Sequence, residues 1–242
     1  RKAGLKPSCV VLVVTIRALK MHGGVEKDDL KKENLDALKK GIPNLERHIH
    51  NIKKFGLEVI VAINHFITDT DKEVKIIQEQ CTKLGVKVSL CTHWSDGGKG
   101  TKDLANNVVE ICKKSDTSKF KHLYSDETPI LEKVKKIAQE IYNAKGIEVD
   151  EKIKEQVKKI EQAGFGRFPV CIAKTQYSFS TDPKLKGAPS GHTLTIREVR
   201  LSSGAEFVVI VCGSIMTMPG LPRVPAAENI KLNKKGEIEG LF

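Results

Sequence analysis

The sequence predicts an α/β fold: a parallel sheet flanked by helices in three layers, followed by a smaller α+β domain. Three runs rich in β-branched residues, at 9–15, 58–63 and 86–91, have the composition of buried strands. Helix-length segments with apolar residues every three or four positions separate them. Because a strand, a crossover helix and a second strand form a right-handed βαβ unit, we expect all three strands to be parallel.

The first run is continuously apolar, which predicts a strand buried on both faces of the sheet. It leads into a basic segment and a flexible turn at Gly23 and Gly24. At the carboxyl end of a strand, Arg17, Lys20 and His22 could meet a phosphate or a carboxylate, and they could equally be ordinary loop charges.

A helix with one apolar stripe is predicted over 35–52, bent at Pro43 and stopped by Gly56. The second strand follows it and ends at the rim where open α/β sheets bind ligands. Polar and aromatic side chains occupy this rim, namely Asn64, Phe66, Thr68 and Asp69. The alternative role for Thr68 and Asp69 is helix capping, since Thr70 and Glu73 form a capping box there.

The third strand ends just before the only tryptophan of the 242 residues, Trp94. Gly97, Gly98 and Lys99 follow it. An indole face, close backbone approach at glycine and a positive charge suit a flat anionic ligand. The alternative is that Trp94 fills the core between a strand and a helix.

After a helix at about 101–113, the polar stretch 114–121 suggests a linker, so we divide the chain into 1–115 and 116–242. In the second part we expect two helices, several strands and a terminal hairpin. Pro129 is expected at the first position of the first helix. The polar segment from Lys174 to Asp182 looks functional, but its residues suggest no mechanism. The predicted elements are helices at 129–141 and 153–164, strands at 170–173, 193–201 and 206–212, a proline-stiffened loop at 216–222 and a hairpin at 230–242.

Composition limits the classes of function. With 41 basic and 30 acidic residues the formal net charge is +11, which invites an anionic partner. The lysines lie on predicted helix faces and aromatic residues make up only 5%, so we expect solvated surface rather than a nucleic-acid interface. No run is long enough for a membrane span. Six scattered cysteines without C-x-x-C suggest reduced thiols in the cytoplasm. The amino-terminal residues do not form a signal peptide and read as part of a longer chain.

The common catalytic motifs are absent from the printed sequence. There is no G-x-x-x-x-G-K-[ST], G-x-G-x-x-G, G-x-S-x-G or H-E-x-x-H. His48 and His50 are two positions apart on a predicted helix, so they face apart and form a poor metal pair. The residues therefore suggest no metal site. If the chain handles ATP, we expect the lysine that binds its phosphates to lie elsewhere.

Several blocks, in order along the whole chain, resemble the formate–tetrahydrofolate ligase family. The blocks are 17–24 (RALKMHGG), 64–69 (NHFITD), 91–100 (CTHWSDGGKG), 173–178 (AKTQYS), 218–222 (MPGLP) and 240–242 (GLF). The resemblance implies a P-loop NTPase-like or Rossmann-like sheet. It also implies a ligase that joins formate to tetrahydrofolate through formyl phosphate, using ATP and Mg²⁺. Family members are about twice as long, and their phosphate-binding loop lies in a part that is missing here.

The resemblance also assigns roles to residues. In the family a phenylalanine and a tryptophan sandwich the pterin ring, and these fall on Phe66 and Trp94. It implies substrates that include polyglutamylated folates, and a homo-oligomer in the full-length enzyme. Without the phosphate loop, we expect these 242 residues alone to be inactive. The alternatives are a non-catalytic nucleotide-binding α/β module, distinguished by nucleotide binding, and a nucleic-acid binder, distinguished by steep salt dependence.

Overall fold

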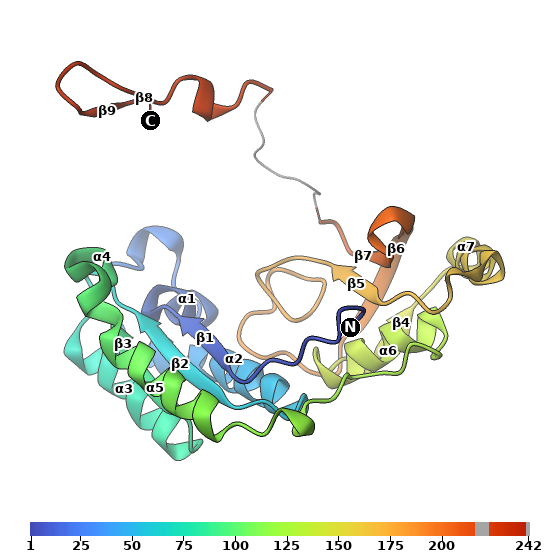
Figure 1. Cartoon of the computed structure of the whole chain (residues 1–242), viewed down its shortest axis with the longest axis horizontal. Helices are drawn as coiled ribbons and strands as arrows, with labels where there is room; N and C mark the ends of the chain where they lie inside the picture. The colour runs from blue at the N-terminus through green and yellow to red at the C-terminus, as the bar shows by residue number, and fades with distance from the viewer. Residues whose placement is uncertain (216–222, 241–242) are drawn as a thin grey trace.

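The computed structural model of the chain describes residues 1–215 and 223–240, which form two hydrophobic cores and a separate hairpin (Figure 1). The helices and longer strands are β1 Val10–Val14, α1 Ile16–His22, α2 Leu35–Lys54, β2 Val59–Asn64, α3 Asp71–Lys83, β3 Lys87–Cys91, α4 His93–Asp96, α5 Lys102–Lys114, α6 Ile130–Glu140, β4 Gly146–Glu148, α7 Glu151–Ile160, β5 Val170–Ala173, β6 Thr193–Ser202 and β7 Phe207–Cys212. The short strands β8 Lys231–Leu232 and β9 Ile238–Glu239 form the hairpin.

The first core is built on a parallel sheet with the order β1-β2-β3. The prediction of three parallel strands is therefore confirmed. The apolar faces of α2 and α3 pack on one side of the sheet, against Val59, Val61 and Ile63 of the central strand. Helix α5 packs on β3 and β2 from the other side, so helices flank both faces. The helix predicted over 35–52 is α2, with Pro43 inside it.

Burial of the first strand was predicted wrongly. Strand β2 is buried on both faces, whereas in β1 the side chains of Val11 and Val13 are 39% and 62% exposed. Strand β1 is an edge of its sheet, and α5 covers β3 and β2. A continuous apolar run therefore identified the strand correctly but not the number of layers that cover it.

The basic segment that the sequence suggested forms helix α1, and the predicted turn follows it at Gly23 and Gly24. Thr15 caps the first turn of α1, because its hydroxyl accepts a hydrogen bond from the Ala18 N–H at 3.1 Å. The helix packs closely on α2 through glycine. A Cβ atom at Gly41 would lie 1.9 Å from the carbonyl oxygen of Leu19. The two helices therefore approach to a distance that only glycine permits at this position.

We expect Gly41→Ala to destabilise the fold, because the added methyl group must push α1 and α2 apart. Overpacking of this kind costs about 1–3 kcal/mol or more, and it opposes the roughly 1 kcal/mol by which alanine favours a helix interior over glycine. Chemical denaturation measures the difference. The control is Gly98→Ala, where a Cβ would meet no atom within 4 Å. Equal stability of the Gly41 variant and the wild type would contradict the close approach.

The second core surrounds a mixed sheet with the order β4-β6-β7-β5, in which β6 and β7 are antiparallel and β5 is parallel to β7. Helices α6 and α7 pack against it. Both helices and the three predicted strands are present, while the short β4 was not predicted. Pro129 caps α6 rather than occupying its first turn. The division into domains at 115 and 116 stays a prediction.

One lysine of the presumed helix surface is buried. The side chain of Lys133 is fully buried, and its ammonium donates to the carbonyl oxygens of Gly166 and Phe168 at 2.8 and 2.9 Å. Burial lowers its pKa. The helical pattern could not show this, because the accepting carbonyls come from the segment that follows α7.

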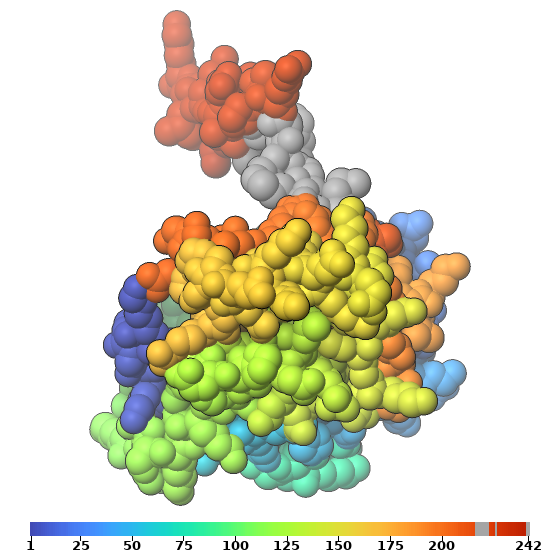
Figure 2. Space-filling model, turned by 90° about the vertical axis from the view of Figure 1, so that its right-hand side faces the viewer, coloured from blue at the N-terminus to red at the C-terminus, as the bar shows by residue number. Residues whose placement is uncertain are grey.

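The terminal hairpin is present as predicted, with β8 antiparallel to β9, and it stands apart from the two cores (Figure 2). The predicted loop at 216–222 and the last two residues of the GLF block lie outside the described residues. Within the described part of the chain, no helix is long and apolar enough to cross a membrane.

Candidate functional site

The ends of β2 and β3 bring the two candidate loops side by side. The register pairs Asn64 with Cys91, and the His65 N–H donates to the Cys91 carbonyl at 3.1 Å, just beyond the sheet. The loop that contains Phe66 and the loop that contains Trp94 therefore leave the sheet at the same edge. The sequence placed both loops at strand ends, and the register shows that the strands are neighbours.

Phe66 lies in a tight turn that Asp69 holds. The Asp69 carboxylate accepts a hydrogen bond from the Phe66 N–H at 2.9 Å, and the Asp69 N–H donates to the Phe66 carbonyl at 2.8 Å. Thr70 and Glu73 form the predicted capping box of α3. Asp69 thus does not cap the helix itself. It fixes the backbone that carries the aromatic ring.

Arg17, at the start of α1, covers one face of Phe66. Its guanidinium carbon is 4.0 Å from the ring centroid, within the range of a cation–π contact. One terminal nitrogen of Arg17 donates a hydrogen bond to the Thr68 hydroxyl at 3.1 Å, so the Thr68 side chain contacts Arg17. A flat ligand that stacks on Phe66 must therefore use the other face. Arg17 acts here as a positioning residue for the ring.

Trp94 projects from the one-turn helix α4 and is 88% exposed. A core position is thereby excluded, since a core tryptophan would be largely covered. The loop around it is held by its own contacts. The Thr92 hydroxyl donates to the Asp96 carboxylate at 2.6 Å, and a Cβ at Gly100 would lie 2.5 Å from the Thr92 backbone. The indole is thus exposed on an ordered support.

The remaining loop candidates are also at the surface. Gly97 adopts a φ of +57° and a ψ of −142°, a conformation that essentially only glycine adopts. Gly98 has open space around it, and the Lys99 side chain is exposed. Asn64, at the end of β2, is half-buried. The rings of Phe66 and Trp94 do not stack on each other in the described chain, so a ligand does not have to separate them.

The other two basic candidates of α1, Lys20 and His22, do not present their side chains at this edge of the sheet. Lys20 is fully buried, 2.9 Å from the Glu73 carboxylate, and donates to the Lys32 carbonyl at 2.8 Å. His22 accepts a hydrogen bond from the Gly187 N–H at 3.2 Å and so faces the second core. Among the basic residues of α1, Arg17 alone contacts the candidate loops in the described structure.

The described residues contain no metal-binding cluster, and the sequence contains no P-loop motif for the phosphates of ATP. In the described part of the chain, no group of three or more His, Cys, Asp or Glu side chains could hold a metal ion. The metal ligands and phosphate-binding groups present here therefore do not fit Mg²⁺-ATP. The edge offers instead two aromatic side chains, a stacked guanidinium, glycines and Lys99.

Comparison with known proteins identifies the family of this chain. A sequence model of the family "Formate--tetrahydrofolate ligase" matches residues 1–242. Proteins named formate–tetrahydrofolate ligase are similar over the whole chain, with 66% identity in Pelagibacter ubique, 59% in Roseobacter denitrificans and 59% in Hyphomonas neptunium. The chain covers 43% of the length of each of these three relatives. It belongs to the formate–tetrahydrofolate ligase family.

Proposed function

We propose that these residues supply the pterin-stacking part of an ATP-dependent ligase that joins formate to tetrahydrofolate through formyl phosphate, giving 10-formyltetrahydrofolate. Family membership supports the reaction class. The observation that carries the site is the 88% exposure of Trp94 on the same sheet edge as Phe66. A large exposed aromatic on an ordered loop is available to a planar ring and contributes little to the core.

The two aromatic residues would act by stacking. A pterin needs its flanking rings about 7 Å apart, because each stacked contact separates two faces by roughly half of that. Neighbouring strands are about 4.8 Å apart, so side chains from adjacent strand ends can reach this spacing. Asn64, Thr68, Asp69, Gly97, Gly98 and Lys99 border the same edge and are weaker candidates for contacts with the substrate.

The phosphate chemistry belongs to other residues of the ligase. ATP with Mg²⁺ would supply the phosphoryl group of formyl phosphate, and a P-loop NTPase-like sheet in the full-length protein would hold it. Arg17 is retained as a weak candidate for assisting that half. We also propose, from family membership, a cytoplasmic homo-oligomer whose basic surface suits folates with polyglutamate tails.

The test combines binding with turnover in the 242-residue chain. Trp94 is the only tryptophan, so its emission reports on this loop alone. A tetrahydrofolate analogue should quench it saturably, while ATP-dependent formylation should be undetectable because the phosphate cradle is missing. If binding needs the rest of the ligase, the quenching should appear in the full-length protein and be absent from its Trp94→Phe variant, which assigns the signal to this residue.

Adenine and guanine nucleotides are the control ligands. Quenching by nucleotides but not by the folate analogue, in both forms of the protein, would support the nucleotide-binding module instead. Measurable formylation by the 242-residue chain would contradict the assignment of phosphate chemistry to other residues.

A further inference from the structure

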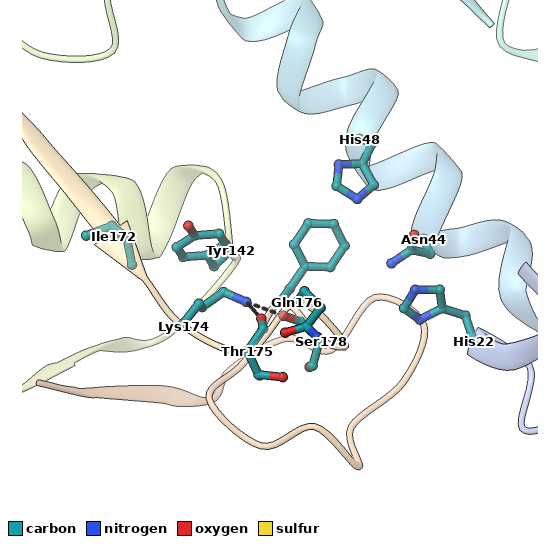
Figure 3. A pocket seen from close by; sticks show the side chains of 10 residues that line it. His22, Asn44, His48, Tyr142, Ile172, Lys174, Thr175, Gln176 and Ser178 are labelled. Carbon is teal, nitrogen blue, oxygen red and sulfur yellow. Dashed lines mark hydrogen bonds between the residues drawn. The ribbon is translucent and has the colours of Figure 1, made fainter. Parts of the chain in front are cut away.

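A cavity of about 260 Å³ lies between α2 and the polar segment that follows β5 (Figure 3). It lies between elements of the two halves of the structure, because α1 and α2 contribute His22, Asn44 and His48, while the residues after α6 and β5 contribute Tyr142, Lys174 and Ser178. The segment from Lys174 to Asp182 therefore contributes to a cavity that the sequence pattern could not show. None of the residues that line it is acidic.

Lys174 brings a positive charge into this cavity without a carboxylate to neutralise it. Its ammonium donates to the carbonyl oxygens of Thr175, at 3.0 Å, and Ser178, and lies 4.9 Å from the ring centroid of Tyr142. Within the described chain no acidic side chain forms a salt bridge with it. Burial lowers its pKa to about 8, so the ammonium is still mostly protonated at neutral pH.

His22 of α1 and Asn44 of α2 make the cavity more polar, and both form hydrogen bonds with the backbone of Gly187. The Gly187 N–H donates to Nδ1 of His22 at 3.2 Å, and Asn44 donates to the Gly187 carbonyl at 2.9 Å. Burial lowers the pKa of His22, which keeps the imidazole neutral. Since Nδ1 accepts, the ring proton resides on Nε2, which is then a hydrogen-bond donor.

We propose that this cavity binds an anionic group, a carboxylate or a phosphate-like oxyanion, with Lys174 as its cationic partner. A half-buried ammonium is favoured when an anion replaces the water it has lost. Because no acidic residue lines the cavity, the anion that pairs with Lys174 would come from a ligand. Lys186 adds positive charge nearby, since its charge helps to lower the pKa of His22, which lines the cavity.

The anionic group has two possible sources. One is a free inorganic dianion. The other is the acidic tail of a larger ligand, a source that rests on the proposed folate function. Arg17, which contacts Phe66, and His22 are on the same helix, about 7.5 Å apart along its axis. A ligand that stacks at Phe66 and carries a chain of carboxylates could extend toward the cavity.

Calorimetry on the full-length protein tests the proposal with sulfate and with N-acetylated tri-γ-glutamate as the two probes. At least one of them should bind, and Lys174→Met should weaken it about tenfold or more, the usual effect of losing a charge-assisted hydrogen bond. Lys174→Arg should retain part of the affinity. The control Lys184→Met makes the same charge change at an exposed position two residues beyond the segment from Lys174 to Asp182 and should leave binding unchanged.

Where Lys174→Met weakens the binding, sulfate alone identifies a free dianion, and tighter binding of the glutamyl peptide identifies an acidic tail; binding that Lys174→Met leaves unchanged overturns the proposal. Failure of both probes to bind the wild type, or an equal loss in Lys184→Met, overturns the proposal. Neither result bears on Trp94 quenching, so the folate proposal is judged separately.

A second measurement on the wild type does not depend on whether a variant folds. Because sulfate keeps its charge from about pH 7 to about pH 9.5, its affinity should fall as Lys174 loses its proton near pH 8. An affinity that stays constant over this range contradicts a role for Lys174. The other titratable groups that line the cavity or act on Lys174 are His22 on α1, His48 on α2, Tyr142 after α6, His192 before β6 and Cys212 on β7.

Discussion

Replacing Glu73 with glutamine is expected to lower the free energy of unfolding by about 3–5 kcal/mol, because it leaves the Lys20 ammonium buried without its anion. Both side chains are fully buried, and their charged atoms are 2.9 Å apart. Glu73 also accepts hydrogen bonds from the Asn34 and Thr70 N–H groups, both at 3.1 Å. One carboxylate thus connects α1, the start of α2 and the start of α3.

Chemical denaturation of Glu73→Gln checks the magnitude, with Glu79→Gln as the matched control. Glu79 is on the same helix, but its side chain is exposed, so its loss should change stability by less than about 0.5 kcal/mol. Lys20→Met should be similarly costly, and the double variant Lys20→Met/Glu73→Gln should lose less than the sum of the two single changes. Additive losses would contradict the ion pair.

The same carboxylate gives a pH dependence with a definite sign. Burial alone would raise the pKa of Glu73, but the hydrogen bonds from Lys20, Asn34 and Thr70 outweigh it and hold the pKa below its usual range. A depressed pKa in the folded state adds stability above the ordinary pKa of about 4.3, and this stability is lost as the pH falls through the folded value. Glu73→Gln should therefore show a shallower loss of stability in acid than the wild type.

Trp94→Ala is expected to weaken binding of a tetrahydrofolate analogue by about 5- to 150-fold, the equivalent of roughly 1–3 kcal/mol for one stacked aromatic face. The stability of the chain should hardly change, because the indole is 88% exposed. Phe66→Ala should weaken binding to a similar extent. It should also lose the contact with Arg17, a cation–π interaction of about 0.5–2 kcal/mol.

The decisive measurement is thermal stability and folate affinity of the same variants in the full-length protein. Trp94→Phe is the control, since it keeps an aromatic face and should retain most of the affinity. A core role for the aromatic residues would give the reverse pattern, a loss of about 3–5 kcal/mol in stability with unchanged affinity per folded molecule. That pattern would end the stacking proposal.

Local sequence signals identified most of the elements correctly. The capping box at Thr70 and Glu73 and the apolar stripe of α2 depend on contacts between residues a few positions apart, so the sequence alone displays them. Helix α1 had such a signal too, in Thr15 followed by apolar residues at 16 and 19, but the basic residues Arg17 and Lys20 beside them obscured it. The blocks around Phe66 and Trp94 likewise pointed to the family that the comparisons confirm.

What the sequence determined by itself is the order of its elements apart from α1 and β4, the parallel sheet and the two aromatic residues at strand ends, because each follows from periodicity or from a local motif. The tertiary structure decided where individual charges and rings lie. It buried Lys20 against Glu73, placed Arg17 on Phe66, left Trp94 exposed and brought Lys174 into the same cavity as His22. These partners are separated by tens to more than a hundred residues, and burial at each depends on which layers pack above it. No periodicity within a single segment carries that information.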